Sequence, residues 1–556
     1  MKRQNITALC LALLLALLPL RGTALALEAA SAKEQDFSVQ QAKAERLSQL
    51  GLFLGEEDGD FDLLRAPTRA EALVMLIRLL GCEKQALEAA YPCPFADVPV
   101  WAAPYVGFGL ERGLTRGVSE TRFGMGEADC AMYLTFVLRA LGYSDAEGDF
   151  VWKDPFALAR QSGILPQGTD TARFLRADVV SVSYAALSAR LKGEDRTLAQ
   201  RLVGQGVLKE LELTGLSWEP DPNGTRLEIL FFDVGQADAA LLRCDGQTML
   251  IDGGNAADSS LLYTYLKEEG IGRLDCVVCT HPHEDHAGGL AGALNAAQAG
   301  LALASAEHAE ERAFLNFLKY LGQQGVSVTV PAPGDRLFLG GAQVQVLGPL
   351  REQNESNNNS LVLRVSFGET SFLFTGDAER EEEQDLLDSG FALESTLLKV
   401  GHHGSDTSAS YAFLRAVAPQ AAVISAGAGN PYGHPSQAVL SRLRDAGTSL
   451  YRTDLQGWIR CVSDGKRLVF ETEREAKELF SGIGQNSAGA GEAGEAMGPS
   501  NGQKGADYVV NLNTGKFHLP SCPSARSIRQ ENRLEFFGTR EELLALRYIP
   551  CGTCKP

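Results

Sequence analysis

Three histidines and two carboxylates occupy the seven residues THPHEDH, 280–286. His281 and His283 lie two residues apart after an apolar run, so at a strand end their side chains leave on the same face. Asp285 and His286 follow at once. Imidazole nitrogens and a carboxylate at this density suit zinc or a similar divalent ion. The segment therefore predicts a metal site, because an exposed turn without a metal has no stabilising reason to be so rich in histidine.

Other candidate ligands stand at the ends of predicted strands. The chain has eight histidines, and three of them, His402, His403 and His434, follow short apolar runs or lie in turns. Asp377 also ends a predicted strand, where a glycine-supported turn can place its carboxylate between two metals. Ligands from separate strand ends converge at one edge of the sheets, which is how a two-metal hydrolase site is assembled.

The elements that must position these residues are strands. Residues 226–475 alternate short β-branched or aromatic runs, such as RLEILFFDVG, TSFLFTGDA and QAAVISAG, with helix-like segments. This texture predicts an α/β or α+β domain with many strands.

The motifs of this region resemble the metallo-β-lactamase fold and, within it, the extracytoplasmic domain of the ComEC competence proteins and similar secreted hydrolases. The resemblance covers about 227–470 and implies an α/β fold, an αββα sandwich. Ala237 stands where the family usually has glycine. The motifs, in the family's order, are FFDVGQADA, LIDGGN, THPHEDHAGG, NNNSLVLR, FTGDAE, KVGHHGS and NPYGHP.

The resemblance also implies roles for the ligands. Two divalent ions, zinc or manganese, would be held, the first by His281 and His283 and the second by Asp285 and His286. Asp377 would bridge them.

The GHHG turn would complete the site. The resemblance makes either His402 or His403 a ligand of the second metal, and the sequence does not choose between them. The other histidine would line the substrate cleft with Asn359, Ser405 and His434. For His434 the alternative is a turn histidine bonded to backbone.

The first metal lacks one histidine that many members of the fold supply between HxHxDH and the bridging aspartate. The only histidine in that interval is His308, in a helix-like segment where a solvent-facing position is expected. ComEC-like members share this lack. We therefore expect a weakly held first metal.

The expected chemistry is hydrolysis by a dinuclear, metal-bound hydroxide, because two adjacent cations lower the pKa of a shared water to about neutrality. A phosphodiester is the most economical substrate, since its negative charge offsets the cations. DNA and a phosphate-containing, teichoic-type wall polymer both fit, whereas a β-lactam fits less well. A wall-associated scaffold with a silent site is the alternative function. The residues assigned to catalysis are Asp285, Asp377, His403 and His434.

The flanking regions predict an exported protein. Residues 1–26 have a basic start, an apolar run too short to span a membrane and small residues before a cleavage point, which is a signal-peptide pattern. No later segment is apolar enough to cross a bilayer, so we expect a secreted or wall-associated chain. With 51 Lys and Arg against 70 Asp and Glu, the net charge is −19, which argues weakly against the whole chain being a nucleic-acid binder.

Residues 33–215 carry a repeated helical pattern over 68–81, 131–143 and 176–191. The TRAE motif at 68–71 and the FADV pattern at 95–98 resemble S-layer homology repeats, which implies binding to a bacterial cell-wall polymer. The later copies depart from TRAE, so a helical scaffold that binds nothing is the alternative.

A Gly- and Ser-rich linker, 481–506, precedes a mildly basic tail, 507–556. The tail has the pattern H-x3-C…C-x2-C and resembles the Ada-type zinc-binding module. One structural zinc ion is expected there, with a disulfide as the alternative. The predicted ligands are His518, Cys522, Cys551 and Cys554.

Overall fold

The computed structural model describes residues 37–474, apart from 56–58, 168, 215, 217 and 219–224, and most of the tail between 508 and 554. The predicted signal peptide, 1–26, and the predicted linker, 481–506, lie outside the described residues. Over the part of the chain that is described, no helix is both long and apolar enough to cross a membrane.

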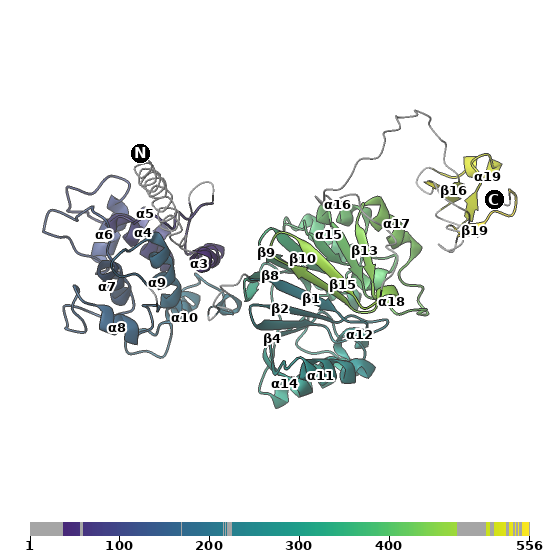
Figure 1. Cartoon of the computed structure of the whole chain (residues 1–556), viewed down its shortest axis with the longest axis horizontal. Helices are drawn as coiled ribbons and strands as arrows, with labels where there is room; N and C mark the ends of the chain where they lie inside the picture. Colours follow the sequence, from purple (N-terminus) through teal and green to yellow (C-terminus); the bar gives the residue numbers. More distant parts are fainter. Residues whose placement is uncertain are drawn as a thin grey trace, which may run out of the picture.

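The first described region is helical (Figure 1). Helices α4, α7 and α9 fall on the three predicted repeat segments. Thr68 begins α4 with a capping box, in which its hydroxyl accepts from Glu71 N and the Glu71 carboxylate accepts from Thr68 N. The helices are α3 (Ser38–Gln49), α4 (Arg69–Leu79), α5 (Glu83–Glu88), α6 (Ala103–Glu111), α7 (Cys130–Ala140), α8 (Phe156–Gln161), α9 (Arg176–Ser188), α10 (Leu198–Gly204) and the short η1 (Glu210–Leu213).

Two mixed sheets follow. The first has the strand order β15-β14-β1-β2-β3-β4-β5-β6 and the second β13-β12-β11-β10-β9-β8-β7. The strands are β1 (Leu227–Phe231), β2 (Ala240–Cys244), β3 (Gln247–Ile251), β4 (Arg273–Cys279), β5 (Gln298–Ala304), β6 (Val328–Thr329), β7 (Arg336–Leu339), β8 (Ala342–Gly348), β9 (Val362–Phe367), β10 (Thr370–Phe374), β11 (Leu397–Lys399), β12 (Ala421–Ile424), β13 (Ser449–Arg452), β14 (Ile459–Ser463) and β15 (Leu468–Thr472).

The two sheets pack face to face through alternating residues. On β1, Ile229 and Phe231 point into the core between the sheets, where they meet Phe372 and Phe374 of β10. Leu230, one residue out of phase, joins the core on the outer face of the first sheet. This period of two places every second strand residue between the sheets.

Helices cover both outer faces, which gives the predicted αββα layers (Figure 1). One group packs on the first sheet and the other on the second. The first group is α11 (Ser259–Glu268), α12 (Glu284–Ala287), α13 (Leu290–Ala296) and α14 (Arg312–Gln323), with the short η2 (Ala256–Asp258). The second group is α15 (Arg380–Asp388), α16 (Tyr411–Val417), α17 (Gln437–Asp445) and α18 (Thr453–Gln456), with η3 (Ser356–Asn359) and η4 (Gly401–Gly404).

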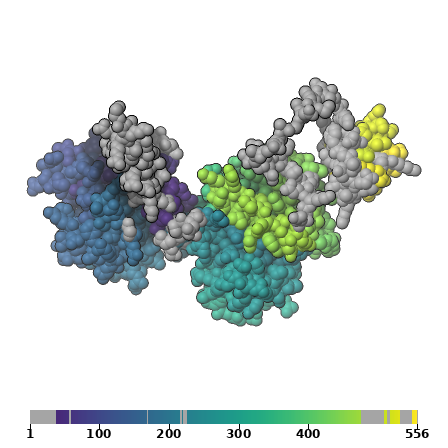
Figure 2. Space-filling view, viewed as in Figure 1, coloured from purple at the N-terminus to yellow at the C-terminus, as the bar shows by residue number. Residues whose placement is uncertain are grey.

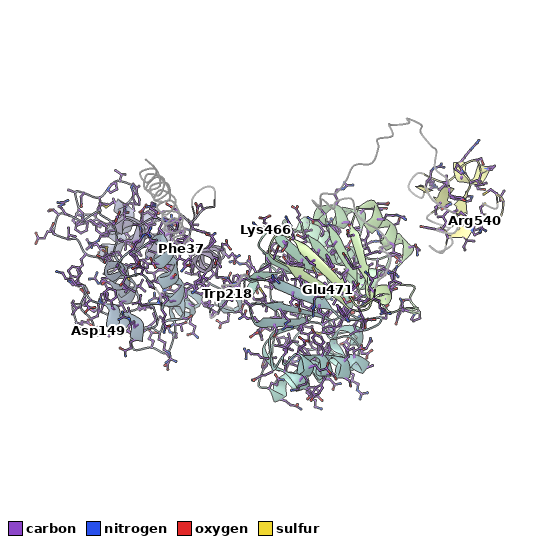
Figure 3. The ribbon with its side chains drawn as sticks, viewed as in Figure 1. Phe37, Asp149, Trp218, Lys466, Glu471 and Arg540 are labelled. Carbon is purple, nitrogen blue, oxygen red and sulfur yellow. The ribbon has the colours of Figure 1, made fainter. Side chains whose placement is uncertain are left out.

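The helical region lies beside the sandwich (Figure 2), and Trp218 stands between the two (Figure 3). A buried arginine joins them. Arg46 of α3 is 1% exposed and donates to Gly340 O at the end of β7. Its guanidinium lies 3.7 Å from the ring centre of Phe338 and 4.8 Å from that of Trp218. Arg336 adds an ion pair with Glu212 at 2.5 Å. The end of the helical region therefore covers edge strand β7, whose free edge would otherwise be exposed.

The tail forms a small sheet of its own in the order β18-β16-β17-β19. Its elements are β16 (Tyr508–Asn511), β17 (Lys516–His518), α19 (Pro523–Arg526), β18 (Arg533–Phe536) and β19 (Ile549–Pro550).

Candidate metal centre

Strand ends from both sheets meet at one edge of the sandwich. His281 and His283 follow β4 of the first sheet. Asp377 follows β10 of the second sheet, and His403 follows β11, which pairs in parallel with β10. Parallel strands end at the same edge, so residues far apart in sequence arrive together.

Four of the predicted ligands form one cluster. One ligand atom each from Asp285, His286, Asp377 and His403 lies within 4.8 Å of the others. His286 Nε2 is 3.1 Å from Asp377 Oδ1, and His403 Nε2 is 3.7 Å from Asp377 Oδ2. His403 Nε2 is also 3.3 Å from Asp285 Oδ2. The geometry thus selects His403, rather than His402, as the fourth member of this group.

Several atoms in the cluster and in His281 beside it are buried without a well-aligned hydrogen bond. They are the Nε2 atoms of His281, His286 and His403 and the Oδ1 atom of Asp377. Buried polar atoms almost always have a partner, so four such atoms around one point require an explanation. A divalent cation, which takes imidazole nitrogen and carboxylate oxygen as ligands, fits this donor set.

Further residues hold the histidine rings in place. His286 Nδ1 donates to Asp252 Oδ2 at 2.8 Å, and Asp252 also accepts from the backbone N and the hydroxyl of Thr280. Through these contacts Asp252 organises its turn. A carboxylate behind a histidine turns the far nitrogen toward a metal and raises its basicity.

His403 has a corresponding support that the sequence did not reveal. Its Nδ1 is 3.1 Å from Ser425 O and 3.3 Å from Asp238 Oδ1. Asp238 in turn accepts from Lys399 Nζ at 2.7 Å, and both side chains are buried. Asp238 lies in the FFDVGQADA motif and Lys399 in KVGHHGS, so the motifs were recognised but the pairing of their residues was not.

The electrostatics of the cluster suit a cation. Burial would raise the pKa of Asp377, but His286 and His403 hold that pKa well below its ordinary value. Burial would lower the pKa of His403, but Asp377 and Asp238 raise it to about 10. The Asp377 and Asp238 carboxylates therefore hold a proton on the His403 imidazole. A divalent cation can take the place of such a proton.

The predicted ligands of the first metal, His281 and His283, lie farther from the other ligands than the four cluster residues lie from one another. His281 Nε2 is 3.9 Å from Asp377 Oδ2. His283 Nε2 lies 2.5 Å from the hydroxyl oxygen of Ser356, in η3. Among the described residues, no group of three or more close ligands includes His281 or His283. His308 is exposed before α14. Weak binding of the first metal stays a prediction.

A cavity of about 450 Å³ opens over the cluster. The residues predicted for the site that line it are His283, Asp285, Asp377, His402, His403 and His434. Glu379 holds the His402 ring, with Glu379 Oε1 2.8 Å from His402 Nδ1. The other ring nitrogen, His402 Nε2, is 4.0 Å from Asp377 Oδ2. His402 is therefore placed as a cleft residue beside the metal cluster.

Two predicted cleft residues do not line the cavity. The Asn359 side chain turns away and donates to Gln353 O, and Ser405 is buried, where its hydroxyl accepts from Thr407. Asn357 lines the cavity instead of Asn359, two residues earlier in the same Asn-rich stretch. Gln236 and Tyr432 also line it, and Gln236 contacts the His434 ring, Nε2 to Nδ1 at 3.2 Å.

Residues 232–428 match the family model of the metallo-beta-lactamase superfamily. Together with the layered sheets and the ligands at their shared edge, this match decides the fold. The central domain has the metallo-β-lactamase fold.

Known proteins resemble this chain over limited lengths. The competence protein ComA of Neisseria gonorrhoeae is 34% identical over 232 residues, 41% of this chain and 31% of that protein. The ComE operon protein 3 of Bacillus subtilis is 31% identical over 252 residues, 42% of this chain and 32% of that protein. A surface layer protein of Brevibacillus choshinensis is 32% identical over 101 residues, 18% of this chain and 9% of that protein. The chain spans about a third of the length of the two competence proteins.

A second candidate centre lies outside the metallo-β-lactamase domain, in the tail. One ligand atom each from His518, Cys522, Cys551 and Cys554 lies within 4.8 Å of the others. All three cysteines are free thiols in this structure. Three thiols and one imidazole suit a closed zinc site.

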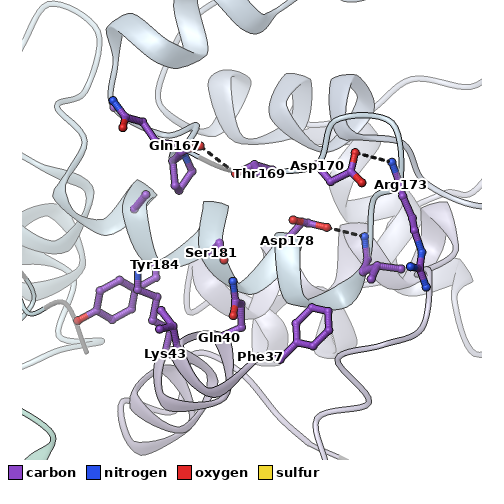
Figure 4. A pocket seen from close by; sticks show the side chains of 15 residues that line it. Phe37, Gln40, Lys43, Gln167, Thr169, Asp170, Arg173, Asp178, Ser181 and Tyr184 are labelled. Atoms are coloured by element: carbon purple, nitrogen blue, oxygen red, sulfur yellow. Dashed lines mark hydrogen bonds between the residues drawn. The ribbon is translucent and has the colours of Figure 1, made fainter. Parts of the chain in front are cut away.

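The helical region carries two hollows of its own. One, of about 490 Å³, lies between α3 and α9, where Lys43 Nζ stands 5.4 Å from the ring centre of Tyr184 (Figure 4). The other, of about 640 Å³, is lined by Arg69 of the TRAE motif and by Arg116, Lys153 and Trp152. The second hollow combines cations with an aromatic ring that is 54% exposed.

Proposed function

We propose that this chain is an exported, metal-dependent hydrolase that cleaves phosphodiesters, in DNA or in a phosphate-containing cell-wall polymer. The observation that carries the proposal is the set of four buried polar atoms without well-aligned hydrogen bonds around Asp377, contributed by His281, His286, His403 and Asp377 itself. The likeness to two competence proteins supports DNA as one substrate class.

The residues present would hold the cations as follows. Asp285, His286 and His403 would bind one ion, His281 and His283 the other, and Asp377 both. Two divalent cations in such a site neutralise charge on a phosphoryl oxygen and acidify a water molecule. Asp252 contacts the far side of the His286 ring, and Asp238 contacts the far side of the His403 ring. The two carboxylates thereby fix the orientation of these imidazoles.

The chain's own groups explain why a cation pair is needed for an anionic substrate. Of the residues that the structure describes, no lysine or arginine lines the cavity, whereas Glu284, Asp285 and Asp377 do. Without metals these carboxylates would repel a phosphate group. With two divalent cations the sign of the local field inverts, so a phosphodiester is attracted.

Hydrolysis of bis(4-nitrophenyl) phosphate by the full chain loaded with Zn²⁺ or Mn²⁺ tests the proposal. We expect metal-dependent turnover that falls by at least about 100-fold in Asp377→Asn, since removal of one electrostatic partner commonly costs that much. His308→Ala is the matched control, because His308 is exposed and lies outside the cavity. No turnover by the folded, metal-loaded chain would favour the alternative of a silent scaffold.

The wall-associated part of the proposal is supported by the hollow that Arg69, Arg116, Lys153 and Trp152 line. Cations beside an exposed aromatic ring suit an anionic sugar polymer. The likeness to a surface layer protein points the same way.

Co-sedimentation of the full chain with purified cell walls measures this binding. We expect the double variant Arg116→Glu, Lys153→Glu to stay in the supernatant. The matched control, Lys84→Glu with Arg190→Glu, reverses two exposed charges in the same region away from the hollow. Equal sedimentation of both variants would leave the helical region as a scaffold.

Export and a zinc ion in the tail belong to the same proposal. The pattern of residues 1–26 supports export, and the His518 and cysteine cluster supports zinc. The N-terminal sequence of the protein recovered from a culture medium and metal analysis of the purified chain measure the two features directly.

A further inference from the structure

The loop between β12 and α17 places an aromatic ring at the rim of the metal cavity. Tyr432 lines the cavity and is 71% exposed, the largest exposure of any aromatic side chain among the described large apolar residues. Single exposed rings are common on protein surfaces, but this one stands where a group entering the cavity would meet it. The ring is therefore a candidate contact for substrate.

The loop that carries this ring is held in one shape by Asn430. Its side-chain oxygen accepts from the backbone N atoms of Tyr432 and His434, each at 3.1 Å. Its amide nitrogen donates to Gly427 O and His434 O. Gln236 fixes the base of the loop by accepting from Gly427 N at 3.1 Å. A ring on a preformed loop binds a partner with little loss of conformational entropy.

Three rings lead from solvent to the metal cluster. The Tyr432 ring is nearly parallel to that of His434, with centroids 5.8 Å apart and an interplanar angle of 29°. The His434 ring meets that of His402 edge-on, with centroids 5.6 Å apart. His402 Nε2 lies 4.0 Å from Asp377 Oδ2. A planar group stacked on the Tyr432 ring is therefore connected to the metal cluster by consecutive ring contacts.

The Tyr432 ring offers a polymer an uncharged, planar contact at the rim of the cavity. Among the described residues that line the cavity there is no lysine or arginine to pair with a phosphate backbone. Bases of single-stranded nucleic acid have π faces that stack on aromatic side chains in any sequence. A polyol-phosphate backbone has no planar face.

We propose that Tyr432 is a specificity-determining residue that stacks a nucleobase of a single-stranded nucleic acid beside the scissile phosphodiester. This inference rests on the proposed phosphodiesterase function and selects one of its two substrate classes. Tyr432 acts through binding of the base and takes no part in proton transfer.

The test compares substrates that differ only in their bases. The full metal-loaded chain is given a short single-stranded oligodeoxynucleotide and an abasic chain of the same length, in which tetrahydrofuran replaces every base. We expect Tyr432→Ala to lower the ratio of kcat/KM, normal over abasic, by about tenfold or more, the effect of losing one stacked base. Tyr432→Phe should keep the ratio, because the ring is retained.

Tyr263→Ala is the matched control, since Tyr263 is also an exposed tyrosine, 43% exposed on α11, and does not line the cavity. Equal losses on both substrates would overturn the inference and make Tyr432 a residue that only shapes the loop. Faster cleavage of poly(glycerol phosphate) than of DNA, unchanged in Tyr432→Ala, would overturn it in favour of the wall polymer.

A binding readout separates this inference from the function on which it rests. 2-Aminopurine in the oligonucleotide loses fluorescence when it stacks on an aromatic ring. If the chain cleaves no phosphodiester, quenching by wild type and Tyr432→Phe, but not by Tyr432→Ala, would still support the stacking site. Absence of quenching by the wild-type chain would overturn it.

Discussion

At the scale of single residues, the candidate centre depends on the groups behind its ligands. The His403 ring is held by Asp238, and Asp238 is balanced by the buried Lys399. A buried carboxylate that loses its only nearby lysine is strongly destabilised as an anion. The position of His403 should therefore depend on a lysine that touches no substrate.

Replacing this lysine with an apolar residue of similar length tests that dependence. We expect Lys399→Met to weaken metal binding by about 10- to 100-fold, the usual effect of losing an outer partner of a metal ligand. Competition for zinc against a chelating indicator measures the affinity. Lys319→Met, at an exposed position, is the control. An unchanged affinity in Lys399→Met would contradict the supporting role.

A carboxylate in the helical region gives a pH dependence of stability. Asp145 accepts two hydrogen bonds from Arg139, both at 2.9 Å, and these lower the pKa of Asp145 below its ordinary value of 3.8. Folding thus favours the charged form, so the stabilisation is present above pH 3.8 and is lost as the pH falls below it. Near neutral pH we expect Asp145→Asn to destabilise by roughly 1–3 kcal/mol.

Thermal unfolding of wild type and Asp145→Asn at several pH values checks this expectation. The difference in Tm should narrow as the pH drops below 3.8. Asp154→Asn, at an exposed position, is the comparison. A difference that stays constant down to acid pH would contradict the role of the charge.

The residues that gather at the edge of the sheets could be predicted from the sequence because they lie in short motifs at strand ends. The HxHxDH segment and Asp377 carry their chemistry in residue type and spacing. Choosing His403 over His402 required the structure, since both follow β11 and both have positive φ, 49° for His402 and 52° for His403. Asn359 was placed in the cleft although Asn357 lines it, because spacing alone does not give the direction of a side chain in a short 3-10 turn.

At the scale of elements, close packing of glycines brings α13 against the end of β3. A Cβ on Gly289 would lie 1.9 Å from Gly253 O. The φ of Gly289 is −81°, which any residue adopts, so contact rather than backbone conformation demands glycine here. The segment that carries Asp285 and His286 is thereby fixed against the turn that carries Asp252.

Gly289→Ala should force these segments apart. We expect a loss of about 1–3 kcal/mol or more in the free energy of unfolding, as for overpacked cores, together with weaker zinc binding. Urea unfolding and zinc competition measure the two effects. Gly272→Ala is the control, because a Cβ there meets no atom within 4 Å. Equal stability of the two variants would contradict the packing argument.

Element types followed from periodicity, with modest errors at the ends. The predicted helix over 68–81 is α4, Arg69–Leu79, since Thr68 caps it as its sequence indicates. The helix expected around His308 begins only at Arg312, because the polar stretch before it has no apolar face to bury. Patterns within one element were visible in the sequence, whereas contacts between elements were not.

At the scale of the whole molecule, the helical region and the metallo-β-lactamase domain share a buried junction. Arg46 and Gly340 are 294 residues apart in sequence, so no local pattern indicated their contact. Burial lowers the pKa of Arg46 to about 10, which still leaves it charged at neutral pH. A charged side chain in this position is tolerated because Phe338 and Trp218 stack on it.

This junction should make the two regions unfold together. A segment that began at 225 would lack Trp218 and Arg46 and expose the Phe338 side chain on edge strand β7, so the full chain is the proper sample for activity. We expect one calorimetric transition for these two regions in wild type. In Arg46→Ala, a loss of about 2–3 kcal/mol at the junction should split this single transition into two.

Arg112→Ala is the matched control, since Arg112 lies over the Phe108 ring, 5.4 Å from its centre, but at an exposed position. Two transitions already present in wild type, unaltered by Arg46→Ala, would mean that the helical region is only tethered to the metallo-β-lactamase domain.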